Sequence, residues 1–135
     1  MSVPRRLLRL PVAFAVWRLP PDAAWHAAAH TARWAFVART PDEVSLILPA
    51  GGPVPSGARQ APGLWHGWRV AGVLDFAWVG LLAELSAVLA QAGIPLLAVS
   101  TFDTDYIFVR AEQRAAAEAA WRAAGWEVAA PDAAA

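Results

Sequence analysis

The chain has 135 residues, no cysteine, and 11 basic and 11 acidic residues, which give a formal net charge of zero. The absence of cysteine excludes disulfides, thiolate zinc sites and cysteine nucleophiles. A neutral chain has no overall positive field to attract a nucleic-acid backbone, so we expect no nucleic-acid partner. The length suits one compact unit or two very small ones.

The N-terminal half predicts a short mixed unit. Residues 12–19 alternate large and small side chains, which indicates a strand, and Pro20-Pro21 ends it. We expect a short helix to follow and to run to about His30, with Asp22 as its cap. Two further strands are expected at 32–38 and 44–48, joined by a turn at 40–43.

Residues 49–67 are rich in glycine and proline and predict a linker. No Gly-Lys-Ser/Thr follows these glycines, so the segment is not a phosphate-binding P-loop. We therefore expect residues 1–60 to form a shortened N-terminal unit with its linker. Residues 61–130 form the C-terminal unit, and 131–135 a frayed tail.

The C-terminal half predicts strands at 68–74, 95–100, 105–110 and 126–130 and helices from about Leu81 and at 112–124. Leu81, Leu82, Leu85, Val88 and Leu89 recur at helical spacing. The order is β-α-β-β-α-β, the ferredoxin-like plan, and the first unit is β-α-β-β, a shortened copy of it. The fold class is therefore α+β.

No membrane segment is expected. The least charged stretch, 81–102, contains Glu84 and is broken by Gly93 and Pro95. Near the N-terminus, Arg9 and Pro11 interrupt any signal-peptide core. We therefore expect a cytoplasmic protein with no membrane partner.

Polar residues gather between two predicted strands, at 100–105. One interpretation is turn chemistry, because hydroxyls and carboxylates bond to nearby backbone. The other is a binding site, because the topology brings the ends of several elements to one end of the unit. The residues expected there are Leu74, Asp75, Gly80, Ser100, Thr101, Phe102 and Asp105.

That end has the chemistry to bind a zwitterion. Free N–H groups at the start of the first helix suit a carboxylate, and Gly80 allows a ligand close approach to the backbone. Asp105, and also Asp75, could hold an ammonium group. Asp75 has a competing role as the helix cap. The expected ligand is a free amino acid or a similar small zwitterion.

The segments 67–76 and 98–107, with Gly80, resemble ACT domains, and 40–46 carries a weaker likeness. The resemblance is to small bacterial proteins with two ACT-like units and to the ACT units of aspartate kinases and cytosolic arginine sensors. It implies an allosteric regulatory role and a homodimer, with a partner enzyme as a further candidate. By the same resemblance the ligand lies between paired units. The ligand-binding residues it implies are Val73, Leu74, Asp75, Val79, Gly80, Ser100, Thr101, Phe102 and Asp105.

Other functions fit less well. No nucleophile, metal cluster or cofactor motif accompanies the aspartates, so we expect no enzyme activity and no cofactor. His26 and His30 are four residues apart on a helix, but no third ligand is evident, so no metal site is expected. His66 is assigned no role. The alternative function is a ligand-free dimerisation or docking protein, favoured if Trp78 and Phe102 fill the site.

Overall fold

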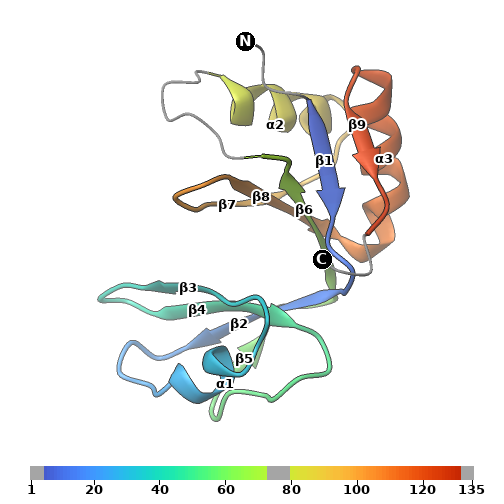
Figure 1. Ribbon diagram of the computed structural model, residues 1–135. Helices are drawn as coiled ribbons and strands as arrows, with labels where there is room; N and C mark the ends of the chain where they lie inside the picture. The colour runs from blue at the N-terminus through green and yellow to red at the C-terminus, as the bar shows by residue number, and fades with distance from the viewer. Residues whose placement is uncertain (1–4, 73–79, 132–135) are drawn as a thin grey trace. The chain divides into compact units, whose positions relative to one another are not determined.

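A computed structural model of the chain describes residues 5–72 and 80–131. The chain divides into two compact units (Figure 1). Unit 1 comprises Met1–Pro11 and His66–Ala135, and unit 2 comprises Val12–Trp65. This division differs from the predicted boundary at 60/61, because residues 1–11 belong with the C-terminal unit.

Unit 1 contains a five-stranded sheet in the order β9-β1-β6-β8-β7. Its first strand along the chain, β1, pairs antiparallel with β6, Leu8 lying opposite Arg69. On its other edge β1 pairs parallel with β9, Leu8 lying opposite Ala129. The strand bounds are β1 Arg6–Arg9, β6 Trp65–Val70, β7 Leu97–Ser100, β8 Asp105–Arg110 and β9 Glu127–Ala129.

Helices α2 (Leu81–Gln91) and α3 (Arg114–Ala123), the latter preceded by the 3-10 turn η1 (Ala111–Gln113), pack on one face of this sheet (Figure 1). The leucine stripe predicted from the sequence lies in the core between helices and sheet. Trp121 is fully buried there, its ring edge-on to that of Trp68 with centroids 4.9 Å apart. The other buried members are Leu7, Val70, Leu81, Leu85, Leu89, Ile94, Ile107, Val109, Ala117, Trp126 and Val128.

Unit 2 is a smaller sheet in which β4 pairs with β2 and β3, and β5 pairs with β2. The first residue of β6, Trp65, also lies opposite Phe14 of β2. A separate core forms around Leu19, Val44 and Leu46. The bounds are β2 Phe14–Leu19, α1 His26–His30, β3 Phe36–Arg39, β4 Val44–Pro49 and β5 Arg59–Gln60.

The predicted α+β, ferredoxin-like C-terminal unit and the shortened β-α-β-β unit before it are confirmed by this element order. Unit 1 adds one strand to the plan, because β1 inserts between β6 and β9. This strand was not predicted, since four residues, Arg-Leu-Leu-Arg, are too few to show an alternation.

Two local predictions in the N-terminal half were wrong. Asp22 does not cap the helix, because Ala23 N–H donates to Pro20 O at 3.1 Å and closes a turn there; α1 begins only at His26. The predicted linker also contains strand structure, since β5 lies within it and β6 begins at Trp65.

Within residues 5–72 and 80–131, no helix is long and apolar enough to cross a membrane.

Candidate functional site

The turn between β7 and β8 is built by the hydroxyl and backbone of two threonines. Thr101 N–H donates to Thr104 O at 2.8 Å, and Thr101 Oγ1 donates to the same carbonyl at 3.0 Å. In return Thr104 N–H donates to Thr101 Oγ1 at 3.2 Å. Thr101 therefore performs the turn chemistry that the sequence allowed as its alternative role.

Ser100 and Asp105 face each other across the same hairpin, as the last and first residues of β7 and β8. Ser100 Oγ donates to Asp105 Oδ1 at 2.7 Å, a short charge-assisted bond. Asp105 is half-buried, and its carboxylate makes no other hydrogen bond or ion pair among the described residues. Because a carboxylate accepts about four hydrogen bonds, it keeps capacity for a ligand donor.

Thr104 fixes this turn to the end of the neighbouring strand. Its side chain is 5% exposed, and Oγ1 donates to Val70 O at 2.8 Å, across 34 positions of sequence. Ala71 N–H, just beyond, donates to Arg6 O at 2.9 Å. The end of β6 and the β7–β8 turn therefore lie together, as the topology predicted. Thr104 was not predicted as a site residue, since nothing in the sequence separates it from the neighbouring hydroxyls.

Gly80 is the N-cap residue before α2 and has a left-handed conformation, with φ of 88°, which a side chain would oppose. Glu84 N–H donates to Gly80 O at 2.9 Å, which is the first bond of the helix. No side chain among the described residues caps this end. The first-turn N–H groups before Glu84 therefore lack intrahelical acceptors, as an anion site at a helix start requires.

Glu84 lies in the first turn of α2 and accepts hydrogen bonds from Arg5 and Trp126. Arg5 Nε donates to its Oε1 at 2.8 Å, and Trp126 Nε1 donates to the same oxygen at 3.2 Å. The bond from Arg5 holds the pKa of Glu84 below its ordinary value, and the same bond raises the pKa of Arg5. Arg5 thus offsets the charge of the acidic residue in the first turn of α2.

Four of the predicted ligand-binding residues, Val73, Leu74, Asp75 and Val79, lie outside the described residues, as does Trp78. Of the remainder, Phe102 is 81% exposed at the tip of the β7–β8 turn and does not fill the site within one copy of the chain. Gly80, Ser100 and Thr101 are also exposed.

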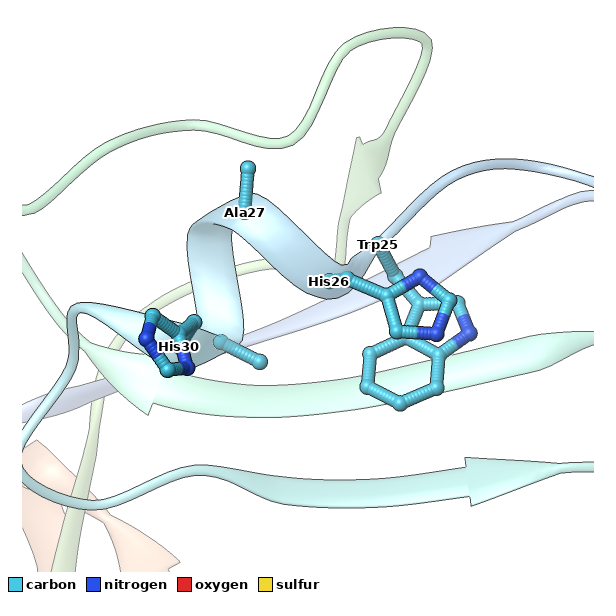
Figure 2. A pocket seen from close by; sticks show the side chains of 5 residues that line it. Trp25, His26, Ala27 and His30 are labelled. Atoms are coloured by element: carbon cyan, nitrogen blue, oxygen red, sulfur yellow. The ribbon is translucent and has the colours of Figure 1, made fainter.

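The histidines of α1 do not converge on one point. The His26 ring stacks on Trp25, with centroids 4.0 Å apart and planes 20° apart. Figure 2 shows the His30 ring at the other end of this short helix, separate from the His26 ring. Both line an open depression of about 420 Å³ with Trp25, Ala27 and Ala29. In the described part of the chain no three potential metal ligands gather.

A buried carboxylate that was not predicted as a functional residue lies on the buried side of α3. Glu118 is 3% exposed; its Oε2 accepts from Trp68 Nε1 at 2.9 Å, and its Oε1 accepts from Arg114 Nη1 at 3.2 Å. Arg9 Nε lies 3.0 Å from Oε2 without hydrogen-bond geometry, so its contribution is mainly charge–charge. The pKa of His66 is lowered, mainly because the ring is partly buried. The positive charges of Arg114 and Arg9 lower it further.

An ACT domain family model matches residues 64–122. This range contains β6, α2, β7 and β8 and most of α3. No match was found among curated protein sequences.

Solved structures extend the likeness over both units. A protein from Agobacterium tumefaciens, 25% identical, superposes with a TM-score of 0.85 and covers 97% of this chain and 96% of its own. An aspartate kinase from Clostridium acetobutylicum, described as an allosteric enzyme, superposes with a TM-score of 0.66 at 10% identity, over 87% of this chain and 33% of the kinase. The regulatory subunit of aspartate kinase from Thermus thermophilus, 14% identical, has a TM-score of 0.59 over 88% of this chain and 96% of that subunit.

Proposed function

We propose that this chain, which contains an ACT domain at residues 64–122, is a non-catalytic regulatory protein that binds a free amino acid. The site would lie at the end of unit 1 where β6, the start of α2 and the β7–β8 turn meet. The family match and the regulatory subunit of aspartate kinase among its structural neighbours support a regulatory, ligand-binding role.

The observation that carries the proposal is the bond from Thr104 Oγ1 to Val70 O. Through it the turn that bears Ser100 and Asp105 is held at the end of β6. Gly80 then precedes α2, whose start no side chain among the described residues caps. One element thus offers a carboxylate and another offers free N–H groups, the pair that a zwitterion needs.

In this proposal the N–H groups at the start of α2 receive the ligand carboxylate and Asp105 receives its ammonium. Ser100 holds one oxygen of Asp105, and the rest of that carboxylate is left to the ligand. Val73, Leu74, Asp75 and Val79 would complete the pocket, and Thr101 and Phe102 would contribute from the turn. Two copies of the chain would pair around the site, and ligand binding would favour one association state of the protein. The protein would act in the cytoplasm, where it would regulate a partner enzyme.

The test is a thermal-shift panel of the standard amino acids on the wild type, Asp105→Asn and Asp103→Asn. Asp103 lies exposed in the same turn, so its variant is a matched control for charge. A ligand at 100 times its dissociation constant stabilises by about 2.7 kcal/mol, which raises the melting temperature by several degrees. We expect a shift with one or a few amino acids, lost in Asp105→Asn and kept in Asp103→Asn.

The alternative is a ligand-free docking or dimerisation protein, and the exposed Phe102 favours it. Two results together would favour this alternative over the sensor. No amino acid would change the melting temperature, and Phe102→Ser would weaken the association of the chain with its partner or with a second copy. If Asp105→Asn and Asp103→Asn abolish the ligand-induced rise in melting temperature equally, Asp105 does not have the specific ligand contact that we propose.

A further inference from the structure

We propose that the helix-free face of the unit 1 sheet carries a second site, which binds a small organic carboxylate or a phosphate through Arg69. A cavity of about 210 Å³ lies there. It is separate from the proposed amino-acid site in its residues, so neither proposal depends on the other. Its lining consists of Arg6, Leu8, Arg9, Leu10, Arg69, Ala129 and Ala130.

Strand alternation determines which of these side chains point into the cavity. Trp68 and Val70 are in the core beneath the helices, so Arg69 between them projects from the opposite face. Leu8 lies directly across from Arg69 on one side and from Ala129 on the other. Residues directly opposite in a sheet share a face, so Leu8 and Ala129 form an apolar floor beside the Arg69 guanidinium.

The charges around the cavity leave Arg69 available. Arg69 makes no ion pair or side-chain hydrogen bond among the described residues and is half-buried. Arg6 is held by Glu127, with Nε 3.2 Å from Oε1 at an exposed position. The Arg9 guanidinium lies against Glu118 on the helix side of the sheet. A half-buried guanidinium that faces no carboxylate among residues 5–72 and 80–131 can form charge-assisted hydrogen bonds with a bound anion.

The dimensions and lining define the ligand class. Pockets for drug-sized ligands measure about 300–1,000 Å³, so this cavity takes a smaller molecule. A planar guanidinium matches the two oxygens of a carboxylate or phosphate, and Leu8 with Ala129 suits a short aliphatic part. Exposed Arg6 can lend a second positive charge by releasing Glu127, since such surface pairs are weak.

The test is calorimetric titration of the full chain with succinate and, separately, inorganic phosphate, at ionic strength held constant with sodium chloride. The variants are Arg69→Met, which keeps the apolar length, and Arg59→Met as the control. Arg59 is an exposed arginine of β5 that likewise has no partner among the described residues. We expect saturable binding of at least one anion, weakened about tenfold or more by Arg69→Met and unchanged by Arg59→Met.

Succinate binding alone assigns the site to carboxylates, and phosphate binding alone assigns it to phosphates. As a second readout, the Arg69 Nε–Hε NMR signal, assigned by its loss in Arg69→Met, should shift saturably with the same anion. No saturable binding of either anion, or equal weakening by both variants, would overturn the proposal. Asp105→Asn should leave this binding intact, which separates a failure here from a failure of the amino-acid site.

Discussion

Replacing Glu118 by glutamine tests whether this buried carboxylate of α3 stabilises unit 1. The substitution keeps the shape and one acceptor oxygen but removes the charge. The side chain of Glu118 is 4% exposed and faces Arg9 and Arg114, whose side chains are 23% and 34% exposed. Glu118→Gln therefore leaves two guanidinium groups around a neutral amide.

The magnitude follows from these contacts. Breaking a fully buried ion pair costs about 3–5 kcal/mol. Here both arginines are partly exposed to water, which screens their charges, so we expect a smaller cost than this range. The bond from Trp68 Nε1 can survive on the amide oxygen, whereas the bond from Arg114 loses its charge assistance. We expect the free energy of unfolding to fall by about 2–3 kcal/mol, which is a large part of the total free energy of unfolding of a small domain.

The assay is urea unfolding at pH 7, followed by tryptophan fluorescence and by far-ultraviolet circular dichroism. Glu112→Gln, an exposed glutamate in η1, is the matched control and should cost only a few tenths of a kcal/mol. If Glu118→Gln falls within about 0.5 kcal/mol of Glu112→Gln, the reasoning fails, because the arginines would then be fully solvated without the carboxylate.

Two further substitutions test packing and charge in the same unit. A Cβ at Gly67 would stand 2.7 Å from Phe108 Cε1 and 3.1 Å from Leu10 Cδ1, so Gly67→Ala should lower the free energy of unfolding by about 1–3 kcal/mol. No loss in urea unfolding would show that Phe108 can move. The pKa of His66 is lowered in the folded state, so the unfolded chain binds protons more readily below pH about 6.5. Wild type should therefore lose more stability than His66→Gln between pH 7 and pH 5, and parallel urea-unfolding curves would contradict this.

The elements with long, regular patterns could be predicted from the sequence. The leucines of α2 repeat at helical spacing, and Gly93 follows its end with φ of 72°. Residues 106–109 are β-branched and aromatic, and β8 (Asp105–Arg110) contains them. In these segments local preference and burial point to the same structure, so the pattern alone was sufficient.

The elements that depend on distant partners could not be predicted. β1 is four residues long and owes its place to pairing with β6 and β9; its Arg6 meets Glu127 across 121 positions of sequence. Gly67 looked like part of a linker, whereas the buried ring of Phe108 requires a glycine inside a strand. Such requirements come from packing between segments, which a single sequence does not display.

In the candidate site, too, some features could be predicted from the sequence and others could not. Topology predicted that the β7–β8 turn and the end of β6 would meet, and the bond from Thr104 to Val70 agrees with it. Topology could not predict that Ser100 would donate to Asp105, or that Arg5 would neutralise Glu84 beside the start of α2. Both depend on the side chains each group faces.

These two contacts make opposite contributions to an amino-acid site. The Ser100 bond occupies one acceptor of Asp105, which weakens its attraction for an ammonium group, but it also fixes the carboxylate before any ligand arrives. Since ordering a free side chain costs about 0.5–1.5 kcal/mol on binding, a carboxylate already held loses less freedom. The Arg5 bond removes the repulsion that Glu84 would exert on a ligand carboxylate at the start of α2. The two ends of the proposed site are thus prepared for opposite charges by neighbours that need not touch the ligand.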